Sequence, residues 1–328
     1  MGPLSRRILI RLSARGALGP GHKAQEDGVR LKEFIIDGGG VPALAANSPL
    51  TSVAKENELP AKAPGNSRVA TYTDLIAGIT DTATGHLAHV TDDWKQGRTT
   101  YGGLSAALCL EAALKTLPEA PPLRSGQFAF IGPAAGELAI ETRVLRQGKS
   151  TLFVGVDLVG EQGLATRAIL TFGAARESLV SHSDLPCPTV PTPDASEPFF
   201  PKGGGPGFGG QFEVRIAGGA RPLSGQPPEY LLWIRHRDTA ARSVAALVAL
   251  ADTPPPPAMT LFPKFGPIST MTWSLDIVGL PPEDDDGWRL LRSTAETIGD
   301  GYSTQDMMLW DATGQPLIAA RQNVAVFV

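Results

Sequence analysis

Three polar side chains in the second half of the chain could together activate a water molecule. Asp252 follows the apolar run 244–251, Thr270 lies at the start of the next predicted strand, and Gln322 lies within the last predicted strand. A carboxylate acts as a general base when its pKa approaches the working pH, and hydroxyl and amide groups can hold the water that it polarises. Asp252, Thr270 and Gln322 are therefore a candidate catalytic group.

An internal comparison singles out the same three residues. When the two halves of the chain are overlaid, each of them falls opposite an apolar residue. These apolar counterparts are Ala113, Leu123 and Ala168. The polar residues belong to a helix end, to the strand after it and to the last strand, and a sheet that curls around a helix can bring such elements together. Exposure to water explains any one of them alone, whereas the three together favour a site.

Asp252 has surroundings that should make it a better base than a free aspartate. It stands in the last turn of an apolar helix, at the negative end of the helix dipole, and Pro254 stops the helix directly afterwards. Burial beside an apolar helix disfavours the charged carboxylate, so we expect a raised pKa. The alternative is a polar residue at a helix end that leads into solvent.

Two similar series of elements must position these residues. From Val69 the pattern predicts a short helix, a strand, an apolar helix at 103–117 and about four alternating strands. Residues 211–328 repeat this order, with a helix at 240–252. Two pairs of glycines bracket corresponding strands at the same spacing: Gly136 with Gly148, and Gly287 with Gly299.

The repeated order predicts an α+β fold of the double hotdog type: two repeats, each with a long central helix wrapped by an antiparallel sheet. The repeats are expected at 69–176 and 211–328, with the catalytic residues in the C-terminal one. Such units pair sheet edge to sheet edge, which removes an exposed edge. Residues 177–210 are rich in proline and glycine and are expected to be a linker without regular structure. Residues 1–68 are expected to be a disordered extension.

Composition excludes several classes of function. The 328 residues carry a net charge of −4, which gives no basic surface for nucleic acid. No apolar run is long enough for a membrane span. The two cysteines lie far apart and favour a reduced, cytoplasmic protein, although the arginines of residues 1–25 leave a cleaved targeting segment as an alternative. No metal or other cofactor is expected, because His86 and His89 fall on opposite faces of a strand.

Four segments together resemble the acyl-CoA thioesterase II family, the double-hotdog thioesterases. They are "TTYGGLSAALCLEAALKTLPE", "RQGKSTLFVGVDL", "PFFPKGGGPGFGGQFEVR" and "WIRHRD", and the likeness covers residues 69–328. The resemblance implies a catalytic Asp, Thr and Gln, which carry over to Asp252, Thr270 and Gln322. The sequence departs from the family at Trp273, where a His is common, at Asn323, where an acid is common, and in the four prolines after Thr253.

The expected function is hydrolysis of an acyl-CoA thioester to free acid and CoA, in the service of lipid metabolism. Asp252 would polarise water, Thr270 and Gln322 would hold it, and backbone N–H groups at Gly102 and Gly103 would stabilise the oxyanion. Acyl-CoA is the expected partner, and association between copies of the chain stays open. One alternative is an acyl-CoA binding or sensing protein that does not hydrolyse its ligand. A hotdog dehydratase is the other, but it needs a His base, and no His occupies the corresponding helix positions.

Overall fold

The described part of the protein consists of a 13-stranded antiparallel sheet, a small two-stranded sheet and the helices packed beside them. The computed structural model describes residues 69–200, 205–282 and 284–328, so the predicted extension 1–68 lies outside it. The α-helices are α1 (Tyr72–Ala77), α2 (Gly102–Thr116) and α3 (Val244–Ala251). The 3-10 helices are η1 (Asp92–Trp94), η2 (Pro193–Ala195), η3 (Gly207–Gln211) and η4 (Pro257–Leu261). No helix in these ranges is long and apolar enough to cross a membrane.

The strands fall into two sets with a short segment between them. The first set is β1 (Thr80–Asp81), β2 (His86–Val90), β3 (Lys95–Gln96), β4 (Thr99–Thr100), β5 (Leu123–Phe130), β6 (Gly136–Gln147), β7 (Thr151–Gly160) and β8 (Gly163–Gly173). The segment between the sets contributes β9 (Glu197–Pro198). The second set is β10 (Phe212–Gly219), β11 (Glu229–His236), β12 (Ile268–Ile277), β13 (Arg289–Gly299), β14 (Tyr302–Asp311) and β15 (Pro316–Val326).

The strand order has an internal two-fold pattern. The first half runs β2-β6-β7-β8-β5, and the second half continues as β12-β15-β14-β13-β11. The halves meet where β5 pairs with β12, with Phe128 opposite Trp273. The expected pairing of sheet edges within one chain is therefore confirmed, and the junction leaves neither central edge open.

Fine details of the strands repeat as well. The β6–β7 register shifts between Val144 and Arg146, and the β13–β14 register shifts between Ala295 and Thr297, the positions 151 residues later. Gly136 and Gly287, which have the same separation, both adopt a left-handed backbone, with φ of 67° and 82°. Such angles suit glycine because it has no Cβ to clash. The repeat inferred from glycine spacing is thus present at the level of bulges and turns.

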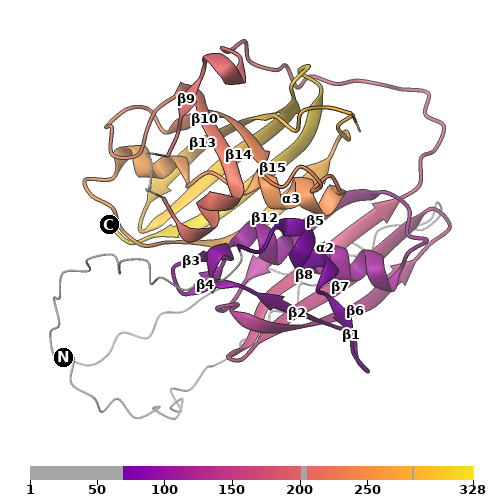
Figure 1. Cartoon of the computed structure of the whole chain (residues 1–328). Helices are drawn as coiled ribbons and strands as arrows, with labels where there is room; N and C mark the ends of the chain where they lie inside the picture. The colour runs from indigo at the N-terminus through magenta and orange to yellow at the C-terminus, as the bar shows by residue number, and fades with distance from the viewer. Residues whose placement is uncertain (1–68, 201–204, 283) are drawn as a thin grey trace, which may run out of the picture. The chain divides into compact units, whose positions relative to one another are not determined.

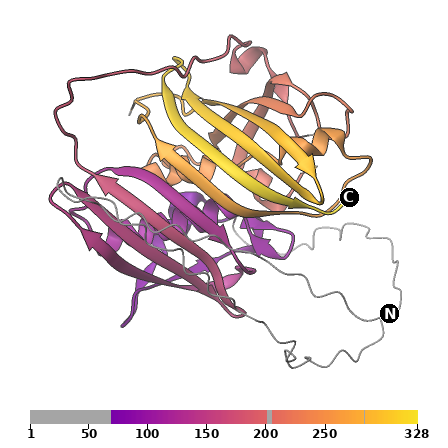
Figure 2. The same ribbon diagram turned by 180° about the vertical axis from the view of Figure 1, so that it is seen from behind.

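Helix α2 forms the centre of the first half. It packs against β6, β7, β8 and α3, and ten of its fifteen residues are buried. Small residues on most of its faces allow the sheet and the second helix to approach it together. Figure 1 shows α2 and α3 side by side, and Figure 2 shows the same chain from behind, with the long strands of each half toward the viewer.

Helix α3 is shorter than predicted. It spans Val244–Ala251 instead of 240–252, because Ser243 caps it: the Ser243 side chain accepts a hydrogen bond from the Ala246 N–H at 3.0 Å. Residues Ala245–Ala251 are all buried. The first half therefore has a helix of fifteen residues, whereas the second half has a helix of eight residues.

The segment 177–210 is not devoid of regular structure. Strand β9 pairs with β10, with Pro198 opposite Arg215, and the helices η2 and η3 lie on either side of β9 in the sequence. Proline is compatible with this position because β9 is an edge strand and needs no second set of ladder hydrogen bonds. Phe199 and Phe208 are buried in the main core. Two phenylalanine side chains thus tie a proline- and glycine-rich segment to the fold.

Candidate functional site

The candidate site lies where the start of α2 meets the end of α3. Asp252 is the residue that terminates α3, and Gly102 is the first residue of α2. Both line a pocket of about 740 Å³, which also reaches Phe130 on β5 and Thr270 on β12. The two halves of the chain therefore contribute jointly to one pocket.

Asp252 and Gln322 are in direct contact. The Gln322 Nε2 donates a hydrogen bond to Asp252 Oδ1 at 2.6 Å, although the residues are 70 positions apart. Gln322 lies on β15 and is 4% exposed. A short hydrogen bond from a buried amide fixes the plane of the carboxylate, which is what an oriented base requires.

Thr270 reaches the same place through a β-bulge. The β12–β15 register shifts between Thr270 and Thr272, so Thr270 pairs with Val324. A second, smaller cavity of about 60 Å³ is lined by Asp252, Thr270 and Gln322 together. Within the described residues the Thr270 hydroxyl makes no hydrogen bond to Asp252 or Gln322. All three predicted residues thus meet around a space of the size that water occupies.

Gly102 and Gly103 are required by the close approach of the two helices. A Cβ at Gly102 would lie 2.8 Å from Asp252 Oδ2, and a Cβ at Gly103 would lie 2.6 Å from the Ala249 carbonyl oxygen. The Gly103 N–H donates to the Asp252 carboxylate. Both predicted glycines thus lie beside Asp252: the Gly103 N–H favours the charged form of the carboxylate, and Gly102 lines the pocket.

Burial raises the pKa of Asp252 from 3.8 to about 7, and the hydrogen bonds from Gln322 and Gly103 limit the rise. The carboxylate is enclosed by both helices and is only partly exposed, toward the pocket. The negative end of α3 opposes the charge, whereas the positive end of α2 favours it. A carboxyl group that titrates near neutrality is suited to accept a proton and to return it.

The end of α3 is completed by other side chains. The Tyr101 hydroxyl donates to the Ala249 carbonyl at 2.7 Å, and the Thr253 hydroxyl donates to the Leu250 carbonyl at 2.6 Å. The prolines that follow have no N–H to offer. Pro254–Pro256 line the small cavity. They therefore form a wall beside Asp252 that adds no competing donor.

Sequence comparison missed one member of this network, Gln305 on β14. Its Nε2 donates to Gln322 Oε1 at 2.8 Å, and the residue is 2% exposed. Gln305 pairs with Gln322 across β14 and β15, as Val154 pairs with Leu170 across β7 and β8. The overlay of the two halves could have shown Gln305, because it also corresponds to an apolar residue of the first half. This correspondence is evident only when the strand register is known.

The strand registers test the overlay of the two halves. The β5–β8 register skips Arg124, and the β12–β15 register skips Met271, so the two strands carry the same bulge. On either side of it, Leu123 pairs with Phe172 as Thr270 pairs with Val324, so Leu123 is the counterpart of Thr270, as predicted. The counterpart of Gln322 is different from the one predicted. It is Leu170 and not Ala168, because Leu170 and Gln322 lie two residues before Phe172 and Val324.

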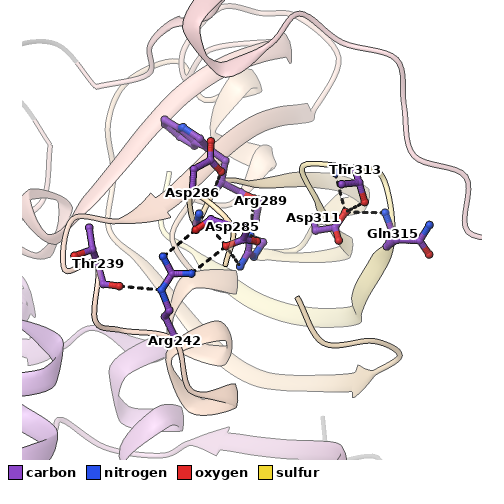
Figure 3. A network of polar contacts seen from close by, with 10 residues as sticks. Thr239, Arg242, Asp285, Asp286, Arg289, Asp311, Thr313 and Gln315 are labelled. Carbon is purple, nitrogen blue, oxygen red and sulfur yellow. Dashed lines mark hydrogen bonds and ion pairs between the residues drawn. The ribbon is translucent and has the colours of Figure 1, made fainter. Parts of the chain in front are cut away.

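The acidic turn before β13 holds arginines and is not simply solvated. Asp285 accepts hydrogen bonds from Arg289 Nη1 at 2.5 Å and from Arg242 Nη1 at 3.2 Å, as Figure 3 shows. In the same view the Asp311 carboxylate closes its own turn by accepting from Thr313 and Gln315. Among the described residues no cluster of His, Cys, Asp and Glu could hold a metal ion.

The strand end 235–237 is largely engaged within the protein. Arg235 Nη2 lies 2.6 Å from Glu213 Oε2, and its guanidinium lies over the Trp288 ring. His236 donates from Nε2 to the Ala246 carbonyl at 2.8 Å, and burial lowers its pKa to about 4. A neutral histidine and a paired arginine are structural in this setting.

Comparison with known proteins identifies two family domains in the chain. Residues 90–173 match the family described as "Acyl-CoA thioesterase N-terminal domain", and residues 186–326 match "Acyl-CoA thioesterase C-terminal domain". An uncharacterized protein of Mycobacterium tuberculosis is 25% identical over 263 residues, which are 72% of this chain and 88% of that protein.

Solved structures share the fold at low sequence identity. A hot dog fold protein of unknown function from Alicyclobacillus acidocaldarius has a TM-score of 0.71 at 22% identity, covering 79% of this chain and 99% of its own. The acyl-CoA thioesterase II TesB2 of Mycobacterium marinum has a TM-score of 0.62 at 18% identity, covering 77% and 97%. The fold is therefore of the hot dog type. Since the two family domains together span more than half of the sequence, the chain belongs to the acyl-CoA thioesterase family.

Proposed function

We propose that the protein hydrolyses an acyl-CoA thioester to a free acid and CoA, with Asp252 as the base that polarises water. The observation that carries this proposal is the buried Asp252 carboxylate, which has a pKa of about 7 and a short hydrogen bond from Gln322 beside a water-sized cavity. A thioester is already activated, so an oriented water is a sufficient nucleophile.

In the first step water attacks the thioester carbonyl carbon and gives a proton to Asp252. Thr270 and Gln322 line the small cavity with Asp252 and supply hydroxyl and amide groups that can hold this water. Negative charge then develops on the carbonyl oxygen. The N–H of Gly102, at the positive end of α2, is the donor that we assign to this oxyanion, because Gly102 lines the large pocket and the Gly103 N–H already serves Asp252.

In the second step the carbon–sulfur bond breaks and the CoA thiolate takes the proton from Asp252. A thiol has a pKa of about 8.5. Proton transfer from an acid with a pKa of about 7 to that thiolate is therefore favourable. The new acid ionises in water, and Asp252 regains its charge for the next cycle.

The same proposal includes the organisation of the chain. Residues 69–176 and 211–328 are two copies of one hotdog unit joined by residues 177–210, and the C-terminal copy carries the catalytic group. The mirrored strand order and the bulges 151 residues apart support it. A role in lipid metabolism, a cytoplasmic location and association between copies stay predictions from the sequence.

The decisive experiment compares Asp252→Asn with the parent protein on short, medium and long acyl-CoA substrates, by release of the CoA thiol. We expect kcat to fall by roughly 10²–10⁴, the range for loss of a general base. Asp276→Asn is the matched control, since Asp276 is an exposed residue of β12. Near-normal turnover by Asp252→Asn would contradict the assignment. If the parent protein binds acyl-CoA without turnover, the binding or sensing alternative is correct.

A further inference from the structure

We propose that Gln305 is a positioning residue for Asp252 that acts through the side-chain amide of Gln322. The rate effect expected below rests on the proposed function, whereas the geometric claim does not.

The three side chains form a continuous hydrogen-bonded chain. Gln305 Nε2 donates to Gln322 Oε1 at 2.8 Å, and Gln322 Nε2 donates to Asp252 Oδ1 at 2.6 Å. Gln305 and Gln322 are 2% and 4% exposed. Bulk water therefore cannot replace either donor at low cost.

The orientation of the Gln322 amide depends on Gln305. An amide can turn by 180° and exchange its oxygen for its NH₂ group, and only one orientation presents a donor to Asp252. Gln305 favours that orientation together with the Asp252 carboxylate, because its Nε2, which also contacts Met307 Sδ at 3.7 Å, donates to the Gln322 oxygen. Without Gln305, Gln322 could present its oxygen to Asp252, and the carboxylate would lose a donor.

The first half shows which residues occupy the equivalent positions when no base must be oriented. Gln305 and Gln322 pair across β14 and β15, and the equivalent pair across β7 and β8 is Val154 with Leu170. Val154 precedes Gln305 by 151 residues, the separation that also relates the bulges of β6 and β13. Both residues of this pair are apolar and fully buried. Packing alone is thus satisfied by Val154 and Leu170 in the same fold.

Gln305 also leaves one polar atom unsatisfied. Its Oε1 is buried and has no hydrogen-bond partner among the described residues, as is true of Ser303 Oγ on the same strand. The equivalent residue of the first half, Val154, avoids this cost. Gln305 differs from Ser303 because its NH₂ group has a defined recipient in Gln322.

The substitution Gln305→Met tests the proposal, because it removes the Nε2 donor and keeps a side chain of similar volume. The titration of Asp252 is followed by NMR of the full chain with ¹³C-labelled aspartate carboxyl groups, alongside the pH profile of kcat/KM. Tyr101, which faces Asp252 from α2, stays protonated throughout because burial raises its pKa well above 10. We expect the Asp252 pKa to rise by about 1, the value of one weakened hydrogen bond to a charged group.

Activity should change in step with this titration. The acid limb of kcat/KM should move to higher pH by the same amount, and kcat should fall roughly tenfold, as for other residues that orient an active-site group. KM should stay near its original value. In the Gln322→Leu background, Gln305→Met should have no further effect on titration or rate.

Ser303→Ala is the matched control, because Ser303 is equally buried on β14 and has no hydrogen-bond partner among the described residues. If Gln305→Met does not fold, Gln305→Asn withdraws the amide by one methylene and should shift the titration in the same direction. An unmoved Asp252 titration would overturn the proposal, even if activity falls. A shift that persists in the Gln322→Leu background would also overturn it. If the parent protein hydrolyses no acyl-CoA, the proposed function fails, and the NMR titration still decides the role of Gln305.

Discussion

Burial of Asp252 makes its carboxylate a better base and also lowers the stability of the folded protein. Its carboxylate is enclosed between two helices and its pKa is raised to about 7, with two hydrogen bonds that hold the charged form. Functional groups often carry such costs, because a group that is ideal for folding is rarely ideal for proton transfer. Two measurements separate the two effects.

The first is the pH dependence of catalysis. The base must be unprotonated, so kcat/KM should rise with pH and reach half of its plateau at about 7, the pKa of Asp252. A pH series of initial rates with one acyl-CoA checks this. Asp276→Asn should leave the midpoint where it is. An acid limb centred near 4 would mean that another group, or an unperturbed carboxylate, controls the reaction.

The second is the pH dependence of stability. The folded-state pKa of Asp252 is about 7 and the reference value is 3.8, so the folded protein binds one more proton than the unfolded chain between these values. The contribution of this group to the free energy of unfolding is therefore fully present below about pH 4. It is lost as the pH rises through 7, and the loss is at most about 4 kcal/mol. Asp252→Asn should raise the free energy of unfolding at pH 8 but not at pH 4. Urea titrations at both pH values test this, and equal effects at both would contradict it.

The sequence indicated three of the four site residues. Asp252 and Thr270 were visible because polar residues replaced apolar ones at positions that an overlay of the halves could match. Gln322 was found although the overlay placed it two residues from its true counterpart, Leu170. Gln305 was not, because it lies in a strand where polar and apolar residues alternate and it could equally face water. Only the pairing of Gln305 with Gln322 shows that it points inward.

At the scale of elements, the site depends on how closely α2 approaches α3. A Cβ at Gly103 would lie 2.6 Å from the Ala249 carbonyl and 2.7 Å from the Tyr101 ring. Gly103→Ala should therefore push the helices apart and lower the free energy of unfolding by about 1–3 kcal/mol, as overpacking does. It should also reduce activity, since the Gly103 N–H holds Asp252.

Thermal unfolding and initial rates check this prediction. Gly299→Ala is the control, because a Cβ at Gly299 would have no atom within 4 Å. An unchanged melting temperature for Gly103→Ala would show that the helix contact can relax without cost.

The sequence predicted the order of these elements better than their ends. Residues 240–243 were expected to be helical because alanine and arginine favour helices. The structure starts α3 only at Val244, since Ser243 caps the helix. Likewise, proline and glycine in 177–210 suggested a bare linker, and the two-residue strand β9 has too short a pattern to detect.

At the scale of the whole described chain, the two halves share one sheet and one main core. Phe128 and Trp273 face each other at the β5–β12 junction, with ring centroids 5.7 Å apart. Trp273 is 1% exposed, so Trp273→Ala should cost about 3–5 kcal/mol. Because the junction belongs to both halves, hydrogen exchange should accelerate in β7 as well as in β14.

Amide hydrogen exchange by mass spectrometry measures both strands in one experiment. Leu309→Ala, on β14 and 1% exposed, is a control placed within the second half. Loss of protection in β14 alone after Trp273→Ala would show that the halves unfold independently.

The β5–β12 junction also affects how the two halves can evolve. In an assembly of two identical chains, every substitution occurs in both copies, so neither copy can lose a polar group alone. Here the two halves have separate sequences within one chain and share one sheet, so each half can change independently. Natural selection could therefore refine Ala113, Val154 and Leu170 for packing while their counterparts kept a charge and two amides. The single substitution Ala113→Asp would place a carboxylate in the first half without glutamines to hold it. The functional difference between the two halves is therefore hard to reverse by one substitution.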